Sequence, residues 1–216
     1  MVNKYRASKI LESLLARYPE PKSALNWNTP WELLVATVLS AQCTDERVNK
    51  VLPDFFRTWP DAKALADSEQ HEVETVIYST GFYRNKARNL RRAAEIIVNR
   101  HAGRVPASMP ELTALPGVAR KTANIILFGA WGINEGVAVD THVKRIANRL
   151  GLTGHTDPFK VEKDLMNLFA RKDWGVLNHC LVLFGRETCA ARKPRCGNCE
   201  LRPLCPWPEK EQYTES

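Results

Sequence analysis

The sequence lacks any long hydrophobic run. No apolar stretch of its 216 residues approaches the ~20 that a membrane-spanning helix needs, and those at 33–39 and 125–131 have the length of core helices. The first residues also lack the positively charged region, apolar segment and small-residue cleavage site of a secretory leader. We therefore expect a soluble, cytoplasmic protein that makes no contact with a membrane.

Strand signals are equally scarce, because runs of alternating β-branched residues bounded by hairpin turns are hard to find. Helix signals recur instead. Thr29 can cap a helix that opens with Pro30 and a capping-box glutamate, and residues 83–101 have the pattern of a long amphipathic helix. We predict an all-α protein, and a chain of this length favours two closely packed lobes.

Acidic residues are outnumbered, since 24 Asp and Glu face 31 Lys and Arg and give a formal net charge of +7. This balance favours an anionic partner, with nucleic acid ahead of a membrane surface. The basic residues gather in two stretches, which contain Arg84, Lys86, Arg88, Arg91 and Arg92 in the first and Arg192, Lys193 and Arg195 in the second. A solvated helix face gives the same kind of charged run, so charge by itself leaves both interpretations open.

Cysteine is sparse too, and four of the six residues lie near the C-terminus in a C-x6-C-x2-C-x5-C pattern. Without a secretory leader, disulfide bonds are disfavoured, and four closely spaced thiolates can surround one metal centre. Four-cysteine zinc sites usually pair two C-x2-C units, whereas here one such unit is flanked by single cysteines. The spacing therefore favours an iron–sulfur cluster over zinc. We predict one [4Fe-4S] cluster with Cys189, Cys196, Cys199 and Cys205 as its ligands.

A glycine turn at residues 115–123, Leu-Pro-Gly-Val-Ala-Arg-Lys-Thr-Ala, separates a short predicted helix at 110–114 from a longer one at 121–131. This is a helix-hairpin-helix pattern. Such a turn can present backbone N–H groups to a phosphate with no side-chain bulk in the way. An ordinary turn between helices has the same pattern, so the turn by itself does not decide between the two.

Lys121 shifts this balance, because it stands at the start of the second helix, where it would be held close to a DNA backbone. An unperturbed lysine has a pKa of ~10.4 and is a poor nucleophile at neutral pH, so a reactive lysine needs a lowered pKa or a nearby base. Asp140, which follows an apolar segment, could supply that base. It equally suits the role of a helix N-cap, and both roles can hold together. We predict Lys121 and Asp140 as the catalytic residues.

Four motifs together resemble the endonuclease III family of DNA glycosylases, nearly end to end. They are LSAQCTDERVNK at 39–50, LPGVARKTAN at 115–124, VAVDTHV at 137–143 and the cysteine loop at 189–205. The resemblance implies a two-domain helix-hairpin-helix fold. A six-helix barrel domain would span 22–134 with the hairpin at 108–131, and a discontinuous cluster domain would combine 1–21 with 135–216. DNA would bind across the cleft between the two domains.

The resemblance also implies the chemistry. The enzyme would remove oxidised or ring-damaged pyrimidines such as thymine glycol from duplex DNA, with Lys121 attacking C1′ of the sugar to form a Schiff base. β-Elimination would then nick the strand, and Asp140 would assist the nucleophile and stabilise positive charge. The expected partner is duplex DNA with damaged pyrimidines or abasic sites, bound by a monomer.

The same resemblance implies a set of DNA contacts. Gln42 looks like the side chain that fills the gap left by the flipped nucleotide, and Phe82 occupies the position of an intercalating wedge. A helix-end amide and a core aromatic are the plain alternatives. Two positions depart from the family pattern: Ala119 replaces a second glycine, and Phe82 replaces an aliphatic residue. The remaining predicted contacts are Gly117, Ala119, Arg120, Thr122, His142, Arg192, Lys193 and Arg195.

The sequence leaves three alternative functions to be weighed against this one. An adenine glycosylase would lack Lys121 and carry a further C-terminal domain, which this chain is expected not to have. A monofunctional mismatch glycosylase of the same superfamily usually lacks the Schiff-base lysine. A non-catalytic DNA lesion-binding module would keep the hairpin and the cluster, and Lys121 together with Asp140 argues against it.

Overall fold

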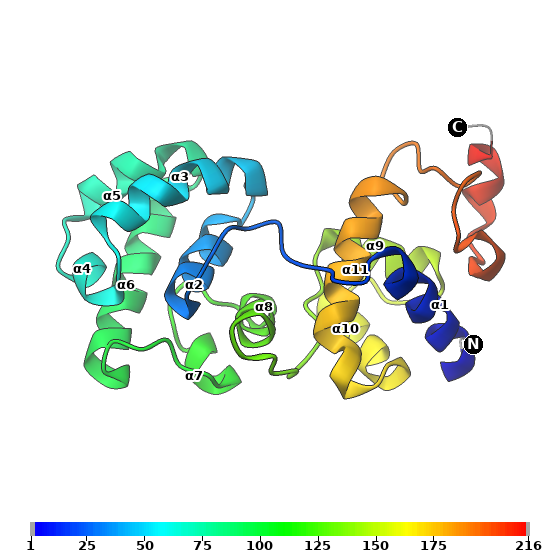
Figure 1. Cartoon of the computed structure of the whole chain (residues 1–216), viewed down its shortest axis with the longest axis horizontal. Helices are drawn as coiled ribbons and strands as arrows, with labels where there is room; N and C mark the ends of the chain where they lie inside the picture. The colour runs from blue at the N-terminus through cyan, green and yellow to red at the C-terminus, as the bar shows by residue number, and fades with distance from the viewer. Residues whose placement is uncertain (1–2, 215–216) are drawn as a thin grey trace. The chain divides into compact units, whose positions relative to one another are not determined.

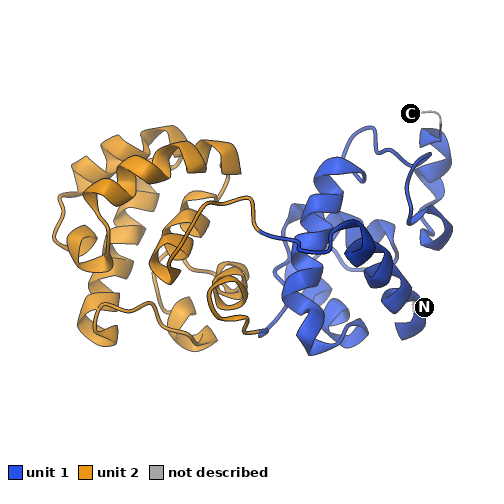
Figure 2. Cartoon of the chain, in the orientation of Figure 1, with its two compact units in different colours: residues 1–22, 134–216 blue, residues 23–133 orange. Residues whose placement is uncertain are grey.

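The computed structural model of the chain describes residues 3–214, which form eleven α-helices, four short 3-10 helices and no β-strand (Figure 1). The prediction of an all-α protein is confirmed. The chain divides into two compact units: unit 1 comprises Met1–Lys22 and Asn134–Ser216, and unit 2 comprises Ser23–Ile133 (Figure 2). Within the described part of the chain, no helix has the length and apolar character to cross a bilayer.

Unit 2 is built around α2 (Pro30–Leu39), which is buried along most of its length. Thr29 begins the helix as predicted: its Oγ1 accepts a hydrogen bond from the N–H of Glu32, and the Glu32 carboxylate accepts one from the N–H of Asn28. The other elements are α3 (Asp45–Thr58), α4 (Ala62–Ala66), α5 (Gln70–Ile77), η1 (Tyr78–Thr80), α6 (Tyr83–His101), α7 (Met109–Thr113) and α8 (Arg120–Trp131). Each fully buried leucine of α2 contributes about 1.5–3 kcal/mol through the removal of apolar surface from water.

Gly129 lets α8 approach α2 closely. A Cβ atom at this position would lie 2.7 Å from Cδ2 of Leu33, which is itself buried. Ile126 and Leu127 of α8 are fully buried in the same core. The tight contact fixes the axis of α8, and with it the hairpin at the N-terminus of α8.

Unit 1 has a core of its own, formed by α1 (Lys4–Arg17), α9 (Thr141–Arg149), α10 (Pro158–Leu168) and α11 (Trp174–Glu187). Three short 3-10 helices, η2 (Arg171–Asp173), η3 (Arg202–Leu204) and η4 (Pro208–Tyr213), complete it. Gly185 brings α11 against α9, because a Cβ there would lie 2.7 Å from Cδ1 of Ile146 and 2.9 Å from Nδ1 of His142. Residues 188–207, which contain the four C-terminal cysteines, follow α11 directly.

Candidate functional site

The hairpin of unit 2 joins α7 to α8 through a turn that needs one glycine. Gly117 has φ +83°, a left-handed conformation that favours glycine. A Cβ at this position would also lie 3.2 Å from Cβ of Asn89. Ala119, the N-cap of α8, has φ −81° and ψ 167°, which is ordinary extended backbone. The alanine that replaces the second family glycine is therefore unstrained.

The N-terminus of α8 has no side-chain cap, because Ala119 carries no hydrogen-bonding group. The first N–H groups of a helix have no intrahelical acceptor and carry partial positive charge, so this end suits an anion. Arg120 is the first residue of the helix, one position earlier than predicted, and Lys121 is the second. The Lys121 side chain is exposed, whereas Arg120 and Thr122 are half-buried.

Asp140 belongs to unit 1, where it caps α9. Its Oδ1 accepts a hydrogen bond of 2.8 Å from the N–H of Val143, and the residue is half-buried. The N-cap interpretation of this carboxylate is therefore correct. Lys121 and Asp140 lie in different units.

His142 follows Asp140 in the first turn of α9 and is half-buried. Its Nδ1 lies 3.2 Å from Nη2 of Arg145. Burial lowers the pKa of His142 and the neighbouring arginines act in the same direction, while Asp140 opposes them. The imidazole is thus biased towards its neutral form.

Two loops of unit 2 hold the residues predicted to enter DNA. Gln42 lies in the turn after α2 with φ 53°, and Phe82 precedes α6 with φ 50°. Both side chains are exposed, and Phe82 has 62% of its surface accessible, so the interpretation of Phe82 as a core aromatic is wrong. Left-handed backbone costs a residue with a Cβ roughly 1–2 kcal/mol, and such strain gathers at functional sites.

The four C-terminal cysteines line one cavity of about 20 Å³ in unit 1, and none forms a disulfide. Among residues 3–214, no three or more His, Cys, Asp or Glu side chains are grouped so that they could hold a metal ion. The shared cavity nevertheless brings together all four predicted ligands, Cys189, Cys196, Cys199 and Cys205.

Basic side chains also line this cavity, and they would favour the negative charge of a four-thiolate centre. Arg149, Arg195, Arg202 and Lys210 contribute to its lining, and Nη1 of Arg149 donates to Sγ of Cys189 at 3.4 Å. Burial raises the pKa of the Cys199 thiol to about 11, and burial together with neighbouring thiolates raises that of Cys196. These thiols stay protonated at neutral pH unless a metal displaces the proton. The donor set fits an iron–sulfur centre.

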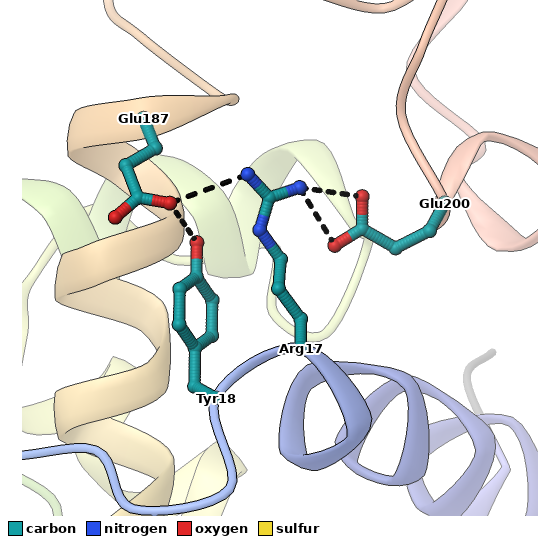
Figure 3. A network of polar contacts seen from close by, with 4 residues as sticks. All are labelled: Arg17, Tyr18, Glu187 and Glu200. Atoms are coloured by element: carbon teal, nitrogen blue, oxygen red, sulfur yellow. Dashed lines mark hydrogen bonds and ion pairs between the residues drawn. The ribbon is translucent and has the colours of Figure 1, made fainter.

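Helix α1 supports the cysteine loop through Arg17. Its guanidinium bridges Glu187 and Glu200, and the Tyr18 hydroxyl donates to the same Glu187 carboxylate at 2.8 Å (Figure 3). Glu187 lies two residues before the first cysteine of the loop, and Glu200 directly follows the third. The network therefore ties the start and the middle of the loop to one helix end.

The predicted phosphate contacts of this loop, Arg192, Lys193 and Arg195, are all exposed. Lys193 has φ 51°. The N–H of Arg195 donates to the carbonyl of Thr188 at 2.9 Å, which closes the chain on itself ahead of the second cysteine. The three basic residues are therefore displayed on a folded-back segment.

Sequence reasoning missed two arginines that support the cysteine loop. Arg145 donates to the carbonyls of Gly185 and Cys189, and Arg149 donates to that of Ala190 at 2.7 Å. The available signal is their spacing, because residues i and i+4 share one face of a helix. The interpretation of Lys86 as part of a basic surface run is wrong, since only 5% of its surface is accessible.

The fold and the hairpin place the chain in a known class. Residues 35–171 match the model of the HhH-GPD superfamily base excision DNA repair proteins. The match covers the hairpin, α8 and Asp140.

Similar proteins of known family identify a narrower group within this superfamily. The chain is 55% identical over 203 residues to endonuclease III of Synechocystis sp. (strain ATCC 27184 / PCC 6803 / Kazusa), an alignment that covers 94% of this chain and 93% of the relative. It is 39% identical over 209 residues to endonuclease III of Escherichia coli (strain K12), an alignment that covers 97% of this chain and 99% of that relative. A solved structure of a trapped endonuclease III–DNA covalent intermediate, an estranged-adenine complex, matches with a TM-score of 0.93 at 38% identity, covering 98% of this chain and 100% of that one.

The chain belongs to the endonuclease III family. It is a base excision repair DNA glycosylase with AP lyase activity.

Proposed function

We propose that this enzyme removes oxidised or ring-damaged pyrimidines, such as thymine glycol, from duplex DNA and nicks the strand through Lys121. The observation that carries the proposal is the exposed Lys121 amine on the second residue of α8, beside a helix N-terminus without a side-chain cap. A related endonuclease III has been trapped as a covalent intermediate with DNA, which is the outcome expected of an amine nucleophile.

The chemistry proceeds in two stages. The Lys121 amine attacks C1′ of the damaged nucleotide, and the bond between C1′ and the base breaks with its electron pair leaving on the base. The sugar ring opens to a Schiff base, a proton is lost from C2′, and the 3′ phosphate leaves by β-elimination. Water hydrolyses the imine and returns the free amine. Asp140 assists the amine and stabilises positive charge on the sugar, while its Oδ1 caps α9.

The DNA contacts divide between the two units. In unit 2, the backbone N–H groups of the turn from Gly117 to Ala119 and of the α8 N-terminus, together with Arg120 and Thr122, grip a phosphate. Gln42 and Phe82 enter the duplex at the lesion. In unit 1, His142 and the exposed basic residues of the cysteine loop, Arg192, Lys193 and Arg195, contact the backbone.

The four cysteines hold one [4Fe-4S] cluster. When bound, the cluster joins residues 189–205 into a single rigid loop and supplies no step of base excision. Support comes from the common cavity, its basic lining and the hydrogen bond from Arg149 to the Cys189 sulfur. Unit 2 then corresponds to the barrel domain at 22–134, and unit 1 to the cluster domain at 1–21 and 135–216. The enzyme acts in the cytoplasm as a monomer on damaged duplex DNA.

Borohydride trapping on a duplex that contains thymine glycol tests the proposal. The wild-type enzyme is expected to form a covalent complex and nick the strand, whereas Lys121→Gln is expected to bind the duplex and do neither. Lys144→Gln is a matched control, because it removes one lysine from a helix without touching the hairpin. Trapping of Lys121→Gln at the wild-type level would refute the nucleophile assignment. Tight, salt-sensitive binding with no trapping of the wild type would instead favour a monofunctional glycosylase.

A further inference from the structure

Lys86 is a buried ammonium that no predicted role uses. It lies in the first turn of α6 and has 5% of its surface accessible. Its Nζ donates to the carbonyl oxygens of Leu39 at 2.7 Å and Thr80 at 2.8 Å. Burial lowers the pKa of Lys86, because removal from water disfavours the charged form, while Cys43 acts in the opposite direction. A buried charge of this kind costs several kcal/mol unless its partners offset the loss of hydration.

The two carbonyl acceptors of Lys86 both lie at helix ends. Leu39 is the last residue of α2 and Thr80 is the last residue of η1. Carbonyls at helix ends lack intrahelical donors and carry partial negative charge, so one ammonium can satisfy two ends at once. Since both oxygens lie within hydrogen-bonding distance of one nitrogen atom, the ends of α2 and η1 meet at Lys86.

Each acceptor is succeeded along the chain by a strained loop. Gln42 comes three residues after Leu39, and Phe82 comes two residues after Thr80. Among the described residues, four with a Cβ have positive φ, and these two loops hold two of them. Each loop also exposes the side chain that is proposed to enter DNA.

We propose that Lys86 is a positioning residue that holds the Gln42 and Phe82 loops in one fixed arrangement, so that both side chains meet the duplex together at a lesion. This inference rests on the proposed function, because it assumes that Gln42 and Phe82 enter DNA. Lys86 itself is buried and does not touch the substrate. Without the ammonium, the two loops lose their shared anchor and sample conformations in which the two side chains act independently.

A duplex with a tetrahydrofuran abasic-site analogue opposite 2-aminopurine tests this role, since the analogue cannot be cleaved. Lys86→Met is expected to lose about tenfold in the ratio of affinity for this duplex over an undamaged one, together with most of the 2-aminopurine fluorescence change. Affinity for undamaged DNA is expected to stay the same. Lys86→Arg, which keeps the charge and several N–H donors, is expected to recover part of the ratio.

Arg88→Met is the matched control, because Arg88 is an exposed residue of α6 whose guanidinium donates to Asn85. It removes the same charge, so any electrostatic loss affects both duplexes and leaves the ratio unchanged. A wild-type ratio and fluorescence change in Lys86→Met would overturn the inference. An equal loss of affinity for both duplexes would also overturn the inference, because it would show that Lys86 supports the fold without positioning the two loops at a lesion. If Lys86→Met fails to fold, the ratio of affinity for the abasic duplex over the undamaged duplex is measured with Lys86→Gln in its place.

Failure of the proposed function has a different signature. If the wild-type enzyme shows no preference for the abasic duplex, or if Gln42→Ala and Phe82→Ala leave the ratio unchanged, then the two loops do not probe DNA. Borohydride trapping of Lys86→Met on an abasic-site duplex separates the two failures further. The inference expects Lys121 to remain reactive, with covalent complex still formed at saturating DNA.

Discussion

Asp140 shows at the scale of one residue how a structural and a chemical role share the same carboxylate. Oδ1 accepts from the N–H of Val143, which leaves the second oxygen available for the chemistry proposed above. An asparagine keeps the capping acceptor and loses the charge, whereas an alanine loses both. The two substitutions therefore separate the roles.

For Asp140→Asn we expect a loss of ~10²–10⁴-fold in base release with little change in thermal stability, because Asn caps a helix about as well as Asp. For Asp140→Ala we expect a further loss of about 1 kcal/mol of stability, or about 2–4 °C in Tm for a chain of this size. Single-turnover kinetics and thermal melts measure the two effects. Full activity in Asp140→Asn would show that the carboxylate acts as a cap alone.

Single residues also mark the limit of sequence reasoning. The exposure of Lys121 and the cap at Asp140 agree with local pattern, since each depends on a few neighbouring positions. The burial of Lys86 could not be predicted, because its acceptors, Leu39 and Thr80, come from two other elements. Arg88, two residues further along the same run, is exposed as a solvated helix face would be.

At the scale of an element, the cysteine loop depends on close backbone packing against the C-terminal segment. The N–H of Gly197 donates to the carbonyl of Tyr213 at 3.1 Å, and a Cβ on Gly197 would collide with the carbonyl of Thr214. A side chain collides here with backbone, which cannot rotate away as a flexible side chain can. Gly197 therefore sets how the loop meets η4.

For Gly197→Ala we expect about 1–3 kcal/mol of destabilisation from overpacking, with displacement of the segment around η4 and weaker retention of iron. Gly154→Ala is the matched control in the same unit, because a Cβ there meets nothing within 4 Å. Thermal melts and iron analysis of the two purified variants provide the comparison. Equal stability and iron content in both would contradict this account of the loop.

Element boundaries show what local signals can and cannot determine. Helix α6 has the predicted bounds, 83–101, because its amphipathic period is long and clear. Helix α8 begins at Arg120 and not at Lys121, because the N-cap Ala119 offers no side-chain signal. Without a capping group, the first helical residue depends on the turn at Gly117, where the positive φ and the nearby Asn89 leave little room for a side chain.

At the scale of the whole molecule, the effect of the net charge of +7 on DNA binding depends on which basic side chains are exposed and unpaired with carboxylates. Arg192, Lys193 and Arg195 are exposed on a loop closed by its own backbone. Other exposed basic residues form ion pairs with carboxylates: Lys50 pairs with Glu46, Arg57 with Asp54 and Lys63 with Asp67. Exposed pairs of this kind contribute little to stability and neutralise their charge locally.

We expect the triple variant Arg192→Gln, Lys193→Gln and Arg195→Gln to bind duplex DNA with a shallower salt dependence. The slope of log K against log salt should fall by about 0.9 for each phosphate that the variant no longer neutralises, because fewer counterions are released on binding. The control changes Lys50, Arg57 and Lys63 to Gln, which removes the same charge from ion-paired positions. Equal slopes in the two triple variants would show that the loop contributes only general electrostatics.

The sequence by itself determined the helical class, the hairpin, the cysteine set and the catalytic candidates, because caps, periodicity and motif spacing are local properties that one segment carries. Only the tertiary structure decided which charges are buried and which are displayed. Lys86 is buried because the end of α2, 47 residues away in sequence, and the end of η1 both supply carbonyl acceptors to its Nζ, whereas Phe82 stays exposed. Close packing at Gly129, Gly185 and Gly197 likewise depends on neighbours that no local pattern identifies.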